Sequence, residues 1–142
     1  MVKQFISCYL TFSPACCDTI LAHLEDTGYR PEEFDLFVSG DLGAFGSEML
    51  LDLADKAHLG LDRRYLDCGA SIYLTEQGFS CGGSGAGCSA VVLAAELLER
   101  IERGDVSRML FLATGALMSP VSAMQGESIP AICHAVVIER EG

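Results

Sequence analysis

Residues 80–90 read Ser-Cys-Gly-Gly-Ser-Gly-Ala-Gly-Cys-Ser-Ala, and residues 91–101 continue as Val-Val-Leu-Ala-Ala-Glu-Leu-Leu-Glu-Arg-Ile. The second stretch predicts a helix, because apolar residues recur at positions 91, 94, 95, 98 and 101, the spacing of one helical face. Apolar residues at 92, 93 and 97 fill the flanks, and a helix that is apolar on nearly all sides is usually buried. We therefore expect a glycine-rich loop that leads into a buried central helix.

The amino end of this helix has two interpretations. Its first N–H groups have no partner within the helix, and the helix dipole makes this end positive. The glycine loop would then suit a small anion or a carbonyl oxygen. Alternatively, the glycines only allow the backbone to pack closely between layers. The spacing of the glycines does not by itself separate these two interpretations.

The composition indicates one domain without nucleic acid as a partner. The 142 residues are enough for a single domain with a hydrophobic core. A formal net charge of −11 argues against direct binding of nucleic acid or of an anionic membrane surface. The mean hydropathy is +0.33, yet no run of 18 apolar residues would span a membrane. We expect some of the apolar surface to contact another protein chain.

The seven cysteines are odd in number and include no Cys-x-x-Cys pair, which argues against a zinc site or a redox motif. Several lie in apolar sequence, where a free thiol behaves as a small hydrophobic group. A reducing, intracellular compartment is the simplest interpretation. The three histidines show no metal-ligand spacing, and neither a metal site nor a cofactor is predicted.

Turn signals divide the rest of the chain into helices and strands. Ser13 and Pro14 are typical of the first positions of a helix, and Gly28 of the residue after its end. The other expected elements are a strand over 34–39, a helix over 47–57, a short strand over 67–74, and strands over 107–113 and 131–139, with a loop over 114–120. This order predicts an α/β fold, a layered mixed sheet in which some strands are parallel.

Four segments together resemble the stage V sporulation protein AD family, a thiolase-fold family of spore-forming bacteria. They are residues 34–43 (Phe-Asp-Leu-Phe-Val-Ser-Gly-Asp-Leu-Gly), 82–90 (Gly-Gly-Ser-Gly-Ala-Gly-Cys-Ser-Ala), 110–117 (Leu-Phe-Leu-Ala-Thr-Gly-Ala-Leu) with Ser119-Pro120, and 125–130 (Gln-Gly-Glu-Ser-Ile-Pro). The likeness implies a thiolase-like domain over residues 13–142, equivalent to the C-terminal half of a longer protein, after a poorly matching segment over 1–12.

The resemblance also implies a function. It points to a role in moving dipicolinic acid into the developing spore, by binding rather than turnover, beside other stage V sporulation membrane proteins. The location it implies is peripheral, at the cytoplasmic face of the forespore or spore inner membrane. Because only one half is matched, we expect a homodimer or a complex with a chain that carries the N-terminal half.

The glycine loop is the expected ligand site, since dipicolinate is a planar dianion and the helix amino end suits one carboxylate. Asp41 is alternatively a turn-forming side chain, and Glu127 lies either at a pocket mouth or on a solvated loop. The candidate ligand-binding residues are Gly83, Ser84, Gly85, Gly87, Cys88, Ser89, Asp41 and Glu127.

Catalysis is not expected. Thiolases and ketoacyl synthases use a His or Asn from this half to polarise a thioester carbonyl or move a proton. The corresponding positions lie in Ser39-Gly40-Asp41 and Gly82-Gly83-Ser84, and a Cys expected near residues 126–128 is also unmatched. The alternative is a partial or degenerate acyl-transfer enzyme with Cys88 as nucleophile, since a helix amino end lowers a thiol's pKa; packing is the favoured role of Cys88. A third possibility is a half-domain that only completes a thiolase-like dimer.

Overall fold

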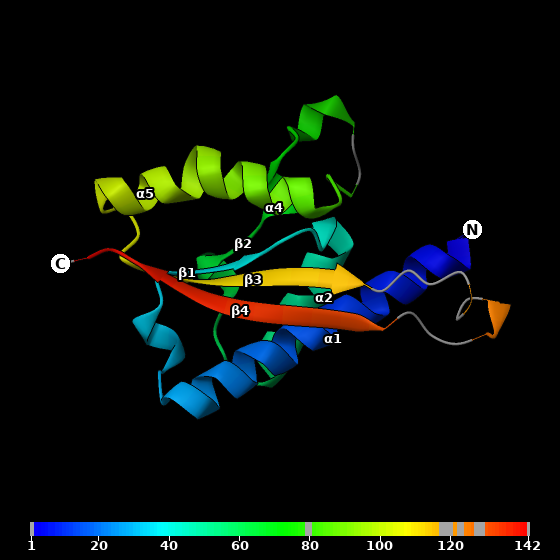
Figure 1. The fold of residues 1–142 in the computed structure, drawn as a ribbon, viewed down its shortest axis with the longest axis horizontal. Helices are drawn as coiled ribbons and strands as arrows, with labels where there is room; N and C mark the ends of the chain where they lie inside the picture. Colours follow the sequence, from blue (N-terminus) through cyan, green and yellow to red (C-terminus); the bar gives the residue numbers. More distant parts are fainter. Residues whose placement is uncertain (1, 79–80, 117–120, 122–123, 127–129, 142) are drawn as a thin grey trace.

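A four-stranded sheet with helices on both faces forms the centre of the protein (Figure 1). The computed structural model describes residues 2–78, 81–116, 121, 124–126 and 130–141. The helices are α1 (Val2–Thr27), α2 (Gly43–Lys56), α3 (Cys68–Ser71), α4 (Ala86–Val92), the π-helical turn η4 (Leu93–Leu97) and α5 (Leu98–Arg103), with 3-10 turns η1 (Pro31–Glu33), η2 (Asp62–Arg64) and η3 (Thr75–Gln77). None of the helices described is long and apolar enough to cross a membrane.

The strands are β1 (Leu36–Ser39), β2 (Tyr65–Asp67), β3 (Arg108–Ala116) and β4 (Ala131–Glu139). Their order in the sheet is β2-β1-β3-β4; β1 is parallel to both β2 and β3, and β4 is antiparallel to β3. The predicted mixed sheet is therefore confirmed. The expected strand over 131–139 coincides with β4, whereas β3 continues to Ala116, so residues 114–116 are not a loop.

Each face of the sheet has its own hydrophobic core. On one face α1 and α2 pack against β1, β3 and β4 around Ile20, Phe37, Leu50, Leu110 and Leu112. On the other face the helical segment 86–103 packs against the sheet, with a core of Leu36, Val38, Cys68, Val92, Leu97, Ile101, Val106, Met109 and Phe111. Burial of each large apolar side chain contributes about 1.5–3 kcal/mol, so both helical layers are held mainly by these contacts.

Helix α1 begins at Val2, so the predicted start at Ser13 is wrong. Ser13 is buried within the helix, and its hydroxyl donates a hydrogen bond to the carbonyl of Gly46 in α2, 2.8 Å away. Pro14 lies inside the helix and removes one backbone hydrogen bond, but α1 remains packed on α2 and the sheet. The predicted end is confirmed, because Gly28 follows Thr27 with φ of +73°.

The helix after the glycine loop is only half buried, so the prediction of a buried central helix is wrong for this chain. Cys88, Val92, Leu97 and Ile101 face the protein, and the step from Val92 to Leu97 contains the π turn. This turn has one more residue than an α-helical turn, so the buried positions are five residues apart from Val92 to Leu97 and four apart on either side. Of residues 91, 94, 95, 98 and 101, which share a face in the sequence pattern, the first four are exposed and Ile101 is buried.

Two other elements differ from the sequence-based expectation. The predicted strand over 67–74 is wrong, because β2 ends at Asp67 and α3 follows directly. The Asp67 carboxylate accepts a hydrogen bond from the N–H of Ala70, which is the usual signal of a helix start. Helix α2 begins at Gly43, four residues before the predicted start at Ser47.

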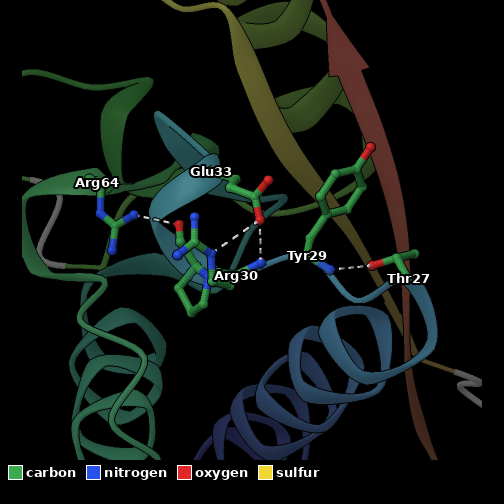
Figure 2. A network of polar contacts seen from close by, with 6 residues as sticks. Thr27, Tyr29, Arg30, Glu33 and Arg64 are labelled. Atoms are coloured by element: carbon green, nitrogen blue, oxygen red, sulfur yellow. Dashed lines mark hydrogen bonds and ion pairs between the residues drawn. The ribbon is translucent and has the colours of Figure 1, made fainter.

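The connection from α1 to β1 is fixed by polar contacts at the amino end of β1 (Figure 2). The Arg30 N–H donates to Glu33 Oε2 at 2.7 Å, and the Tyr29 N–H donates to Thr27 Oγ1 at 3.4 Å. Arg64 of η2 donates to the carbonyl oxygens of Pro31 and Phe34, and its guanidinium lies over the Phe37 ring. The loops at the other end of β1 contain the candidate site.

Candidate functional site

The candidate site lies where the carboxyl ends of β1 and β3 meet the glycine loop, residues 81–87. Carboxyl ends of neighbouring parallel strands form one edge of a sheet, where α/β proteins usually bind ligands. Gly40 lies at this meeting point: a Cβ atom placed on it would be 3.1 Å from Thr114 Oγ1 and 3.6 Å from the Ser89 Cβ. The turn after β1, the end of β3 and the start of α4 are therefore in close contact.

Asp41 connects these three segments. Its Oδ2 accepts hydrogen bonds from the Gly85 N–H at 2.6 Å and from the Ser84 hydroxyl at 3.3 Å. Its Oδ1 accepts one from the Thr114 hydroxyl at 2.8 Å. Hydrogen bonds to a carboxylate are stronger than those between neutral groups, and the positive end of the helical segment favours the negative charge. The loop thus binds a carboxylate that belongs to the chain itself.

A second carboxylate, Asp67, fixes the turn that carries Asp41. It is 4% exposed, and its Oδ2 accepts from the Ser39 hydroxyl at 2.6 Å and the Leu42 N–H at 2.8 Å. Its Oδ1 accepts from the N–H groups of Gly43 and Ala70, both at 2.8 Å. Burial raises the pKa of Asp67, although these hydrogen bonds counteract part of the effect. One buried carboxylate therefore joins the end of β1 to the starts of α2 and α3.

The glycines of the loop have different roles. The Gly83 N–H donates to the Gly69 carbonyl at 2.7 Å, and a Cβ on Gly82 would lie 2.3 Å from that same oxygen. A Cβ on Gly83 would lie 2.8 Å from the Cys88 sulfur. Close packing therefore explains Gly82 and Gly83. It does not explain Gly85 or Gly87, where an added Cβ would meet nothing within 4 Å.

The structure brings three of the predicted site residues, Asp41, Ser84 and Gly85, into direct contact. Ser84, Gly85 and Gly87 are exposed, and the Ser89 hydroxyl donates to the Ala86 carbonyl at 3.0 Å. Glu127 lies outside the described residues. Whether these residues bind a ligand stays a prediction.

Cys88 is buried, 6% exposed, directly below the loop. Its burial raises the pKa of the thiol, and the charge of Asp41 acts in the same direction. This is opposite to the shift that a helix amino end alone would give, and it disfavours the thiolate that a nucleophile requires. The burial agrees with a packing role for Cys88.

Three residues of the site, Ser39, Asp67 and Thr114, were not identified from the sequence pattern. Each is a polar residue near the carboxyl end of a parallel strand, where the sheet ends and loops begin. That position is the signal that would have identified them. It was hidden because Asp67 was assigned to the start of a strand and Thr114 to a loop.

The chain is similar to known sporulation proteins. Residues 6–139 match the family described as Stage V sporulation protein AD (SpoVAD). A curated relative, Stage V sporulation protein AD of Bacillus subtilis (strain 168), is 38% identical over 130 residues, which are 92% of this chain. The chain spans 38% of the length of that relative.

Proposed function

Because the chain belongs to the stage V sporulation protein AD family, as its four sequence segments predicted, we propose that it is a non-catalytic component of dipicolinic acid uptake during sporulation. The family name itself implies a role in sporulation. The finer proposal is that the glycine loop, together with the turn after β1, binds dipicolinate or another small anion. Membrane-embedded sporulation proteins would recruit the chain to the cytoplasmic face of the forespore membrane.

One observation supports the choice of ligand chemistry. The Ser84 hydroxyl, the Gly85 N–H and the Thr114 hydroxyl converge on a single carboxylate, Asp41, at the exposed start of α4. The next residues, Ala86 and Gly87, are also exposed, and the first N–H groups of a helix have no partner within it. The amides of Ala86 and Gly87 are suited to a carboxylate of a ligand. The Ser84 hydroxyl, whose bond to Asp41 is the longest of the three at 3.3 Å, would turn from Asp41 to donate to that ligand.

The non-catalytic role is supported by the state of Cys88. A thiol whose pKa is raised by burial is a poor nucleophile at neutral pH. Incubation of the chain with a small acyl thioester, followed by intact-mass measurement, tests this point. No acyl adduct is expected; an adduct that disappears in Cys88→Ala would instead support the acyl-transfer alternative.

The exposed face of the α4–α5 segment supports a protein partner. Val91 and Leu98 are 54% and 40% exposed, and Ala94 and Ala95 between them are also exposed. We call these four residues the apolar helix face. Exposed apolar side chains gathered on one helical segment are typical of an interaction surface. We propose that a second copy, or a chain with the N-terminal half, covers this face, and sedimentation of the chain alone and in mixture distinguishes the two.

Ligand binding is tested by thermal unfolding in increasing dipicolinate, with benzoate as a single-carboxylate control. A ligand that binds only the folded state stabilises it, by about 2.7 kcal/mol at a hundredfold excess over Kd. The unfolding midpoint is expected to rise and saturate with dipicolinate and to stay constant with benzoate. An unchanged midpoint would contradict a site within this chain.

A matched pair of variants assigns the binding to the loop. Ser84→Ala removes an exposed hydroxyl beside Asp41, whereas Ser107→Ala removes an exposed serine hydroxyl before β3, at the opposite end of that strand. The dipicolinate-induced shift is expected to fall in Ser84→Ala and to be retained in Ser107→Ala. Equal shifts in the two variants would place the ligand elsewhere.

A further inference from the structure

Two buried thiols from distant parts of the chain are in contact. Cys16 lies on α1 and Cys133 on β4, 117 residues later, and their sulfur atoms are 3.4 Å apart. Cys16 is fully buried, and Cys133 is 8% exposed. The Thr19 hydroxyl donates to the Cys133 carbonyl at 3.1 Å and fixes this part of β4 against α1. The pair is unrelated to the glycine loop.

We propose that Cys16 and Cys133 are an oxidation site, at which a small peroxide converts the two thiols into a disulfide between α1 and β4. A disulfide requires a sulfur separation of about 2.05 Å, so the two sulfurs must approach by roughly 1.4 Å. The two cysteines lie in regular elements that already pack on each other. The reaction therefore replaces an existing contact with a covalent bond.

The electrostatics of the pair favour one sulfur as the reacting atom. The Cys16 S–H donates to the Cys133 sulfur, and this hydrogen bond lowers the pKa of Cys133, although burial opposes it. The same hydrogen bond, together with burial, raises the pKa of Cys16. Because Cys133 accepts this hydrogen bond, the attacking sulfur in the proposed reaction is that of Cys133, and Cys16 is the thiol that resolves the intermediate. Cys133 is also the residue of the pair with some exposure to solvent.

The chemistry balances with hydrogen peroxide as the oxidant. The Cys133 thiolate attacks one peroxide oxygen, a sulfur–oxygen bond forms, the oxygen–oxygen bond breaks and hydroxide leaves. The Cys16 sulfur then attacks the Cys133 sulfenic acid, forming the sulfur–sulfur bond. The sulfenic hydroxyl leaves with the Cys16 proton as water. In total two thiols are oxidised, and one peroxide is reduced to two molecules of water.

The other described core thiols are less suited to this reaction. Burial raises the pKa of Cys17, and it also raises the pKa of Cys68 and of Cys88. Of the five buried thiols Cys16, Cys17, Cys68, Cys88 and Cys133, only Cys133 has a lowered pKa. Among the buried described thiols, oxidation is therefore expected at the Cys16–Cys133 pair, whose sulfur atoms are already in contact. A bond across 117 residues closes a long loop, which restricts the unfolded chain strongly.

The experiment treats the reduced 142-residue chain with about one equivalent of hydrogen peroxide, blocks the remaining thiols by alkylation and maps the disulfides by mass spectrometry. We expect a loss of two hydrogens and a peptide containing Cys133 linked to the peptide that contains Cys16. The thermal midpoint of the oxidised chain is expected to rise, on the order of 10 °C, and to return to its original value after reduction.

Variants identify the partner within the linked peptide. Cys17→Ala removes an adjacent buried thiol and is the matched control, in which the cross-link is expected to form as in the parent chain. Cys16→Ala is expected to abolish it. A cross-link that survives in Cys16→Ala, or that is lost in Cys17→Ala, overturns the assignment. Absence of any cross-link in the parent chain, while the urea-unfolded chain oxidises, also overturns it, and this test does not depend on how the variants fold.

Discussion

Replacement of Asp67 tests whether one buried carboxylate organises the candidate site. Its two oxygens accept four hydrogen bonds, three of them from backbone N–H groups, at Leu42, Gly43 and Ala70, and one from the Ser39 hydroxyl. Asp67→Ala removes all four acceptor positions. Asp67→Asn keeps the size of the side chain and one oxygen, and it replaces the other oxygen with an NH₂ group.

The hydrogen bonds of Asp67 predict different losses in the free energy of unfolding for the two variants. A buried N–H that loses its acceptor costs about 1–3 kcal/mol, so Asp67→Ala is expected to lower the free energy of unfolding by about 3–9 kcal/mol. In Asp67→Asn the retained oxygen can still accept from Gly43 and Ala70, and the Ser39 hydroxyl can rotate to accept from the new NH₂. The Leu42 N–H then faces another donor, at a cost of about 1–3 kcal/mol.

Urea unfolding followed by circular dichroism measures both differences. A typical domain has a total unfolding free energy of about 5–15 kcal/mol, so Asp67→Ala is expected to unfold part of the population without denaturant. Asp62→Asn, which changes an exposed aspartate in η2, is the matched control and should differ by less than about 0.5 kcal/mol. If Asp67→Ala costs less than about 1 kcal/mol, the carboxylate does not organise the turn and the reasoning is refuted.

Three further predictions concern the loop, the pH response and the apolar helix face. Gly85 has φ of +103°, so Gly85→Ala should lower the free energy of unfolding by about 1–2 kcal/mol in urea titrations. Gly87 lies in α4 with open space around it, so Gly87→Ala should raise the free energy of unfolding by roughly 0.5 kcal/mol. A loss of stability in both variants would contradict this distinction between the two glycines. Burial raises the pKa of Asp67, so the Asp67 carboxyl binds a proton more tightly in the folded chain than in the unfolded chain. The contribution of Asp67 to stability is therefore largest at acidic pH and is lost as the pH rises through the folded-state pKa. Unfolding measured between about pH 4 and pH 7 should therefore show the stability advantage of the parent chain over Asp67→Asn shrinking as the pH rises, and a widening difference would show that the sign is wrong. The double variant Val91→Glu/Leu98→Glu should weaken association with the partner chain at least tenfold in sedimentation experiments. Its free energy of unfolding should change by less than about 1 kcal/mol, because both side chains are exposed. Unchanged association would show that the apolar helix face is not the interface.

The candidate site could be predicted only in part. The sequence indicated the glycine loop and Asp41, because glycines before a helix and a Gly-Asp-x-Gly turn after a strand are local signals. It gave no indication that Thr114 bonds to the same carboxylate, since 73 residues separate the two. The role of Asp67 was missed for a different reason. Residues 67–74 were expected to form a strand, whereas the Asp67 carboxylate accepts a hydrogen bond from the Ala70 N–H at the start of α3.

The sequence by itself determined strands β1, β3 and β4, though not β2, together with the mixed α/β class and the family. The alternation over 131–139 and the apolar run over 107–113 are local patterns, and β4 and most of β3 follow them. The end of α1 at Gly28 was likewise encoded locally, because glycine adopts positive φ at little cost.

Only the tertiary structure decided which faces are buried and which distant residues meet. In the α4–α5 segment the buried residues are Cys88, Val92, Leu97 and Ile101, so of the predicted face 91, 94, 95, 98 and 101 only Ile101 is buried, and the π turn accounts for the five-residue step from Val92 to Leu97. Packing against α2 retained Ser13 inside α1, although its sequence favours a helix start. Folding also brought Cys16 to Cys133 across 117 residues. Local patterns report the preferences of a short segment, whereas these features depend on contacts that exist only once the layers have packed.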